Sequence, residues 1–87
     1  MEPDDEALLD AVGRRIGELR QRVGLTQAEV AERFGTTISN YQRIEHGLQN
    51  LTLITMAKIA RVLSVEVGSL LERPRSKRRG PGRPPKR

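Results

Sequence analysis

The chain has 87 residues and a formal net charge of +5, from 16 lysine and arginine residues against 11 acidic ones. This length has room for one domain with a modest core, so we expect no separate small-molecule effector domain. The sequence has no cysteine and one histidine, His46, so it offers neither a thiolate site nor a cluster of ligands, and we expect no metal and no cofactor. No apolar run approaches the roughly 18 residues that span a bilayer, so we expect a cytoplasmic protein with no membrane partner.

The charge is divided unevenly along the chain. Residues 1–73 hold nine basic and 11 acidic residues, whereas residues 74–87 hold seven basic residues, no acidic residue and four of the five prolines. A block of like charge repels itself and stays solvated, and such blocks often serve as arms for nucleic acid. We therefore expect one folded domain over residues 1–73 and a disordered basic tail over residues 74–87. The alternative is that the positive charge serves solubility alone.

The first element is predicted to be a long amphipathic helix. Five apolar residues recur at spacings of three and four along one stripe: Leu9, Val12, Ile16, Leu19 and Val23. Acidic residues 4–6 suit its first turn, where they meet the positive end of the helix dipole. Gly13 and Gly17 each cost this helix about 1 kcal/mol relative to alanine, and the sequence gives no reason for Gly17.

Two short helices are predicted next, separated by about three residues. Thr26 and Glu29 match a capping box, in which each side chain satisfies a backbone donor of the other, so a helix is expected over residues 27–34. Gly35 ends that helix. Thr37 can cap a third helix over residues 38–46.

The remaining elements are also expected to be helical. Thr52 can cap a helix over residues 53–63, and a short fifth helix over residues 67–72 would complete the core. No stretch alternates between apolar and polar residues with the β-branched content of a strand. The predicted fold class is therefore all-α, a compact five-helix domain followed by the tail.

Two stretches resemble a known family. Residues 25–35 read Leu-Thr-Gln-Ala-Glu-Val-Ala-Glu-Arg-Phe-Gly, and residues 41–47 read Tyr-Gln-Arg-Ile-Glu-His-Gly. Together they resemble the lambda-repressor-like (Cro/repressor, xenobiotic-response-element type) helix-turn-helix family, and residues 53–65 look like that family's fourth helix. The resemblance covers about 60 residues and implies a five-helix DNA-binding domain. It also implies that the third helix docks in the major groove by its N-terminal half.

The third helix has one face suited to reading bases. On a helical wheel Tyr41 and Ile44 point one way, which leaves polar side chains on the opposite face with Arg43 as the single charge. Base edges in the major groove present donors, acceptors and the thymine methyl group, so a protruding polar face suits them. The predicted base-reading residues are Ile38, Ser39, Gln42 and Arg43.

Each predicted reader has a chemical role and an alternative. Arg43 can donate two hydrogen bonds to guanine, or it can be an ordinary solvated arginine. Gln42 can offer a donor and an acceptor to a base, or contact only phosphate or water. Ile38 can pack on a thymine methyl group, or shield the turn between the helices. Ser39 fits either base or phosphate.

Further residues are expected at the DNA backbone or inside the domain. Free backbone donors at the start of the second helix attract phosphate, and the resemblance implies that Gln27 clamps the DNA backbone. The predicted phosphate contacts are Thr26, Gln27, Asn40 and His46. The resemblance also implies that Glu45 pairs with Arg20 within the domain and stays off the DNA.

Three positions depart from the family pattern. Thr36 stands where an apolar residue is usual, Leu51 where proline is common, and Ile54 where a polar residue is common. Leu51 and Ile54 either mark a surface for a partner or pack inward.

The tail resembles an AT-hook, a minor-groove motif centred on Gly-Arg-Pro, here Gly82-Arg83-Pro84. An extended chain stiffened by proline fits the narrow groove of A·T-rich DNA, whose negative potential attracts arginine. Pro81 stands where the motif has a second arginine, so the alternative is a plain polybasic arm. The predicted tail contacts are Lys77, Arg78, Arg79, Arg83, Lys86 and Arg87.

These features predict a homodimeric transcription regulator at the nucleoid, most simply a repressor, that binds double-stranded DNA at a palindromic operator. Leu70 and Leu71 are candidates for the dimer seam, although a monomer would use the same leucines in its core. Two alternatives stay open: an antitoxin-like protein that sequesters a protein partner, and a nucleoid-organising protein of low sequence specificity. No hydroxyl side chain pairs with a base histidine and no carboxylate pair is evident, so no enzyme is predicted.

Overall fold

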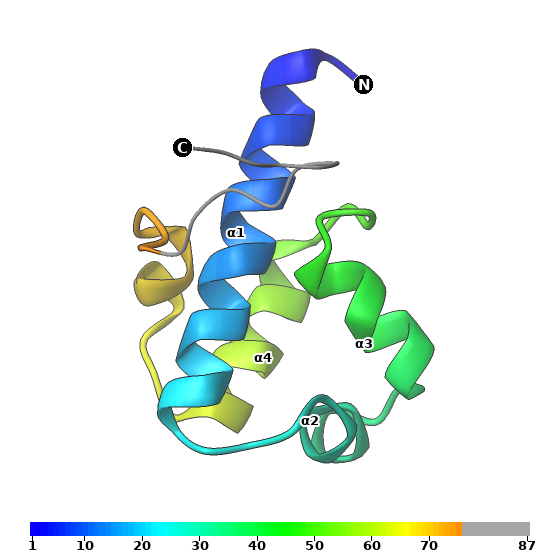
Figure 1. Cartoon of the computed structure of the whole chain (residues 1–87), viewed down its shortest axis with the longest axis vertical. Helices are drawn as coiled ribbons and strands as arrows, with labels where there is room; N and C mark the ends of the chain where they lie inside the picture. Colours follow the sequence, from blue (N-terminus) through cyan, green and yellow to red (C-terminus); the bar gives the residue numbers. More distant parts are fainter. Residues whose placement is uncertain (76–87) are drawn as a thin grey trace, which may run out of the picture.

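The computed structural model describes residues 1–75 of the chain. Four α-helices are followed by a 3-10 helix (Figure 1): α1 (Pro3–Arg22), α2 (Gln27–Phe34), α3 (Ile38–Glu45), α4 (Leu53–Leu63) and η1 (Val67–Leu71). These 75 residues contain no strand, as the sequence predicts. The predicted AT-hook, with its contacts from Lys77 to Arg87, lies outside the described residues.

Threonine side chains start three of the helices at the predicted positions. Thr26 accepts a hydrogen bond from the backbone N–H of Glu29 at 3.0 Å, and the Glu29 carboxylate accepts one from the N–H of Thr26 at 2.8 Å. The Thr37 and Thr52 hydroxyls likewise accept hydrogen bonds from the N–H groups of Asn40 and Thr55 at the start of α3 and α4, without the reciprocal bond of a capping box. Each such cap is worth about 1 kcal/mol, because it satisfies a backbone donor that the helix leaves free.

Two predicted helices are corrected, one in its last residue and one in its type. Helix α3 ends at Glu45, and His46 is its cap. The fifth α-helix predicted over residues 67–72 is wrong, because the segment forms only a 3-10 helix, in which the N–H of Ser69 donates to the carbonyl of Glu66. A residue before proline disfavours helical backbone angles, so Arg73, which precedes Pro74, does not extend the helix.

Val23 was expected on the buried stripe of α1, and this is also wrong. The residue is the C-cap of α1 and 44% exposed, since the chain turns there towards α2. At the other end, residues 1–8 are exposed, and the first turns of α1 project beyond the rest of the domain (Figure 1).

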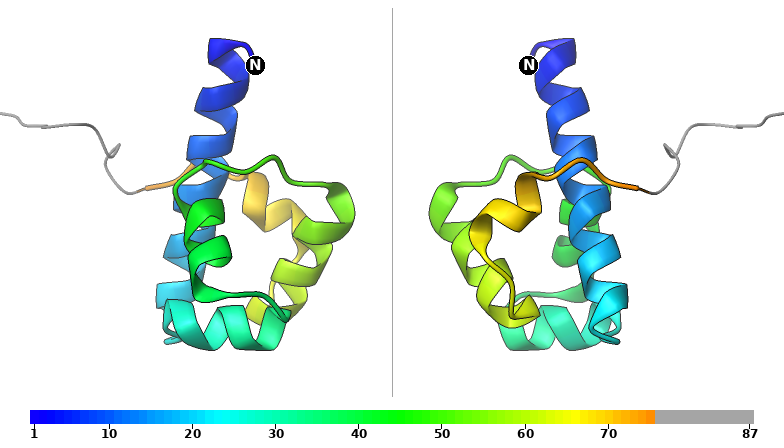
Figure 2. Two further views of the ribbon diagram at one scale, coloured as in Figure 1. Left: turned by 90° about the vertical axis from the view of Figure 1, so that its right-hand side faces the viewer. Right: turned by 90° about the vertical axis from the view of Figure 1, so that its left-hand side faces the viewer.

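The core lies between α1, α3 and α4 and is closed by α2 and η1 (Figure 2). Helix α1 packs against α3 and η1, and α2 packs against α3 and α4. The core residues are apolar and come from every element: Val12, Ile16, Leu19, Val30, Ala31, Tyr41, Ile44, Met56, Ile59, Ala60, Leu63 and Leu70. Burial of these side chains supplies the main driving force for folding.

Glycines allow α1 and α3 to approach closely. A Cβ on Gly13 would lie 2.5 Å from the carbonyl oxygen of Glu45 and 2.6 Å from that of Ile44. Gly47, just after α3, has φ +71° and would place a Cβ 2.7 Å from the Cα of Asp10. At both glycines the backbone of the neighbouring segment occupies the space that a side chain would need. This close approach of the two backbones fixes the position of α3 against α1.

Arg15 attaches η1 to α1. Its Nε donates to the carbonyl oxygen of Ser69 at 2.9 Å, and its Nη2 donates to the Glu72 carboxylate at 2.8 Å. The two candidate seam residues therefore differ in exposure. Leu70 is fully buried in the core of its own chain, and Leu71 is 60% exposed.

Candidate nucleic-acid interface

The turn between α2 and α3 is held by backbone hydrogen bonds. Gly35 has φ +91°, a conformation that glycine adopts without strain, and the N–H groups of Gly35 and Thr36 both donate to the carbonyl of Ala31 at 2.9 Å. The Thr36 hydroxyl accepts a hydrogen bond from the Asn40 amide at 2.8 Å. That bond explains why a polar residue is tolerated in a turn where the family usually has an apolar one.

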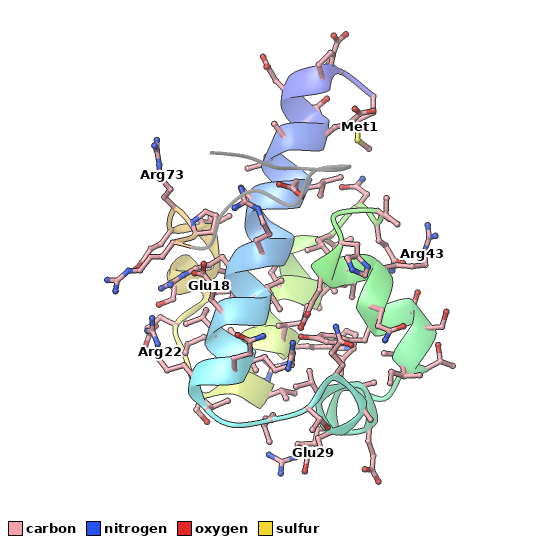
Figure 3. The ribbon with its side chains drawn as sticks, viewed as in Figure 1. Met1, Glu18, Arg22, Glu29, Arg43 and Arg73 are labelled. Atoms are coloured by element: carbon pink, nitrogen blue, oxygen red, sulfur yellow. The ribbon has the colours of Figure 1, made fainter. Side chains whose placement is uncertain are left out.

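The two faces of α3 differ as the sequence predicts. Tyr41 and Ile44 are buried against the core. The opposite face presents the predicted readers, of which Ile38, Ser39 and Arg43 are exposed and Gln42 is half-buried. In Figure 3 the Arg43 side chain extends from α3 away from the body of the domain. The structure thus brings the four predicted readers together on one surface.

Arg43 is anchored while its charge stays in solvent. Its Nη2 donates to the carbonyl oxygen of Leu48 at 3.0 Å, and the N–H of Leu48 donates to the carbonyl of Arg43 at 2.9 Å. A guanidinium carries five N–H donors, so others remain for a ligand.

Glu45 is the centre of a polar network beneath α3. Arg20 donates to its carboxylate through two atoms, Nε at 2.6 Å and Nη2 at 3.2 Å, so the ion pair implied by the resemblance is present in the structure. The Tyr41 hydroxyl and the Gln27 amide also donate to this carboxylate. Four donors on one buried carboxylate leave it well satisfied.

Electrostatics in the network favours the charged pair. Burial acts to raise the pKa of Glu45, but hydrogen bonds from Arg20, Tyr41 and Gln27 outweigh it and lower that pKa below its ordinary value. The hydrogen bond to Glu45 raises the pKa of Arg20. Burial and the neighbouring carboxylate raise the pKa of Tyr41, so its hydroxyl keeps the proton that it donates.

The four predicted phosphate contacts are placed differently. Thr26 and His46 are exposed. The side chains of Asn40 and Gln27 are half-buried and hydrogen-bonded within the domain, Asn40 to Thr36 and Gln27 to both Glu45 and Gln42. Gln27 Nε2 carries two N–H donors and Glu45 takes one, so the other remains for a phosphate.

Sequence reasoning missed that Tyr41 and Gln27 donate to Glu45, and it left Gly17 unexplained. The Tyr41 hydroxyl was assigned only an apolar role, although its spacing of four residues from Glu45 on a helix was a usable signal. Gly17 had no explanation, and the structure supplies one: a Cβ there would lie 3.2 Å from Oε1 of Glu45. That contact lies 28 residues away along the chain, so no local pattern revealed it.

The two unusual apolar positions have different outcomes. Leu51 is half-buried and packs against the core, whereas Ile54 is 66% exposed. Of the two alternatives, packing inward therefore holds for Leu51 but not for Ile54.

Two further searches cover residues 1–75 only. No helix in that part of the chain is long and apolar enough to cross a membrane. Its acidic and histidine side chains form no group of three that could hold a metal ion.

Comparisons with known proteins agree with this geometry. The helix-turn-helix family HTH_3 matches residues 16–70. An uncharacterised HTH-type transcriptional regulator, y4dJ, from Sinorhizobium fredii (strain NBRC 101917 / NGR234) is 39% identical over 54 residues, which are 62% of this chain and 70% of the relative. The alignment includes more than two thirds of that protein.

Solved structures share the fold. The restriction-modification controller protein C.AhdI from Aeromonas hydrophila has a TM-score of 0.73 at 34% identity, covering 77% of this chain and 97% of that one. The clp gene regulator ClgR from C. glutamicum has a TM-score of 0.72 at 23% identity, covering 74% and 82%, and shows the fold alone. With the family match spanning more than half of the sequence, the chain belongs to the helix-turn-helix family of DNA-binding transcription regulators.

Proposed function

We propose that this protein is a sequence-specific regulator that reads double-stranded DNA with α3 in the major groove, as a homodimeric repressor on a palindromic operator. The observation that carries this proposal is the outer face of α3. It presents Ile38, Ser39, Gln42 and Arg43 on one surface, while Tyr41 and Ile44 hold the helix to the core. An α-helix with a polar, weakly charged face matches the width and chemistry of the major groove.

The readers have distinct proposed roles. Arg43 donates to a guanine edge, Gln42 pairs with a base through its amide, and Ile38 packs on a thymine methyl group. Ser39 contacts a base or a phosphate. Ile38 is exposed at the first position of α3, which supports an outward role over shielding of the turn.

Phosphate contacts are proposed around this helix. Thr26 and Gln27 lie at the N-terminus of α2, where backbone N–H groups precede the first hydrogen bond of the helix and the helix dipole favours an anion. Asn40 lies in the first turn of α3, and His46 is the C-cap of that helix. Together these contacts would set the depth and angle of α3 in the groove.

Dimerisation is proposed because one domain of this size reaches only one major groove. Leu71 is the exposed residue of the candidate pair and can lie at a two-fold seam, whereas Leu70 already completes the core of its own chain. The alignment covers 97% of C.AhdI, so that controller protein consists of little more than this domain, which supports a regulatory role for such a small domain.

The basic tail is proposed to add contacts beside the site read by α3, at phosphates or in the minor groove, while the protein acts on nucleoid DNA in the cytoplasm. Its seven basic residues and absence of acidic ones support this role.

Selection of bound fragments from random double-stranded DNA, at a stated salt concentration, tests the proposal. We expect a palindrome whose half-sites lie about one helical turn apart, and a mass for the complex that corresponds to two chains. Recovery of fragments with no common sequence would contradict sequence-specific reading and favour a nucleoid-organising protein. A single half-site bound by one chain would contradict the dimer alone.

A further inference from the structure

A chain of amide groups links the buried carboxylate of Glu45 to the reading surface. Gln27 Nε2 donates to Oε1 of Glu45 at 3.0 Å, and Gln42 Nε2 donates to Oε1 of Gln27 at 3.0 Å. Glu45 is buried, whereas Gln27 and Gln42 are half-buried, so the chain leads from the interior to the surface of α3.

The direction of each amide follows from the chemistry of its neighbour. Glu45 is ionised beside Arg20 and can only accept hydrogen bonds, so the atom of Gln27 that faces it must be the nitrogen. The oxygen of Gln27 then faces Gln42 and can only accept, so the nitrogen of Gln42 must face Gln27. The ionised carboxylate thus determines which end of each amide is the nitrogen. Shape alone would not, because the NH₂ group and the oxygen of an amide are nearly the same size.

Gln42 is left with a defined set of groups for a ligand. One N–H is used by Gln27, so the amide offers its Oε1 and one N–H. Adenine presents one acceptor, N7, and one donor, the N6 amino group, which this set matches. Guanine presents two acceptors, N7 and O6, and would need two N–H donors from the same amide.

We propose that Gln27 is a positioning residue for base reading, which transmits the polarity of Glu45 to the amide of Gln42 and so makes Gln42 select adenine over guanine. This inference rests on the proposed function, because it requires α3 to lie in the major groove. It assigns Gln27 a role in specificity in addition to its proposed contact with phosphate.

The test measures the ratio of the affinities for two duplexes, so that changes in overall affinity cancel. A Gln42→Ala variant first identifies the base pair in the selected operator at which preference is lost. Wild-type protein and Gln27→Met are then titrated on two duplexes that carry adenine or guanine at that position. Gln21→Met is the matched control, since the same substitution is made at an exposed position outside the network.

We expect wild type and Gln21→Met to bind the adenine duplex about tenfold more tightly, which is the scale of one good base contact. For Gln27→Met the ratio should fall to within about twofold, because the amide of Gln42 can then rotate. Loss of a phosphate contact would weaken binding to both duplexes equally and leave the ratio unchanged, as would a small loss of stability. An unchanged ratio in Gln27→Met would overturn the inference.

A second measurement needs no variant. In a third duplex, the unsubstituted base called purine replaces adenine, so that N7 is kept and the N6 amino group is missing. Wild type should bind this duplex about as weakly as the guanine duplex. Equal binding of purine and adenine would overturn the inference, because Oε1 of Gln42 would then accept nothing from the base. If Gln42→Ala changes no base preference, the inference fails while the proposed function stands. If wild type itself shows no sequence preference, the proposed function fails and the inference with it.

Discussion

Gly17 lies directly beneath the carboxylate of Glu45, so that a Cβ on the glycine would lie 3.2 Å from Oε1. The neighbouring Gly13 faces backbone instead, since its Cβ would lie 2.5 Å from the Glu45 carbonyl oxygen. A side chain can shift by a few tenths of an ångström more easily than a packed backbone can.

These two glycines should therefore differ in their response to alanine. Gly13→Ala should lower the free energy of unfolding by about 3 kcal/mol, because α3 must move away from α1. Gly17→Ala should cost less, because it meets the movable side chain of Glu45, and the roughly 1 kcal/mol that either alanine gains in helix propensity then offsets most of the smaller strain. Urea unfolding of both variants tests this order, and equal losses would show that α1 and α3 are not in backbone contact at Gly13.

Stability should depend on pH through Glu45. Its pKa is lowered in the folded protein, so its contribution is fully present above the unfolded-state pKa of about 4.3 and is lost as the pH falls through the folded-state value. Glu45→Gln should cost about 3 kcal/mol at pH 7, because Arg20 loses its ionised partner within the domain.

The experiment compares urea unfolding of wild type and Glu45→Gln from pH 7 to pH 3. The difference between them should shrink as the pH falls below about 4, since protonation removes the charge of Glu45 in wild type as well. Other carboxylates titrate equally in both proteins and cancel in this comparison. A difference that stays constant over the whole range would show that ionisation of Glu45 contributes nothing to folding.

Much of the fold could be predicted because its signals are local. The bounds of α2 and α4 follow from the caps Thr26 and Thr52 and from the apolar residues after them. These signals join residues no more than four positions apart in the chain. The reading face of α3 follows from helical periodicity. The 3-10 geometry of η1 and the exposure of Val23 could not be predicted, because both depend on how the chain turns between packed elements.

The candidate site was predictable in part for the same reason. Its four readers lie on one short helix, whereas the hydrogen bonds of Gln27 join residues 15 and 18 positions apart. The pairing of Arg20 with Glu45 came from family resemblance and not from spacing. Contacts between distant segments depend on tertiary packing, which periodicity alone does not report.

Arg43→Ala should weaken binding to the selected operator by about 1 to 3 kcal/mol and relax the preference at one base pair in each half-site. Thermal stability should change little, because the side chain is exposed and holds only the Leu48 carbonyl. Arg22→Ala is the matched control, since Arg22 lies on the opposite side of the molecule in Figure 3. A loss that is equal for all DNA sequences would mean that Arg43 contacts only the DNA backbone.

Removal of residues 74–87 should change the salt dependence of binding. The slope of log affinity against log salt is about −0.9 per neutralised phosphate, so contacts from four of the seven basic residues contribute about −3.6 per chain. The truncated protein should show a flatter slope and select the same core sequence. An unchanged slope would exclude the tail from DNA binding.

Arg83→Ala separates the two interpretations of the tail. For a minor-groove hook, this change should weaken binding more on A·T-flanked than on G·C-flanked operators, because the narrow A·T groove attracts arginine most strongly. Equal losses on both flanks would leave a polybasic arm without preference.

Nuclear magnetic resonance of the full chain on its selected operator shows whether α3 lies in the major groove. Chemical shifts of the isotope-labelled protein are compared with and without DNA, and we expect the largest changes at the amides of residues 38–43 and 26–28. The same experiment on DNA methylated at guanine N7, which lies in the major groove, should lose those changes. Changes concentrated in α4 and η1, with residues 38–43 unaffected, would show that α3 does not bind the groove.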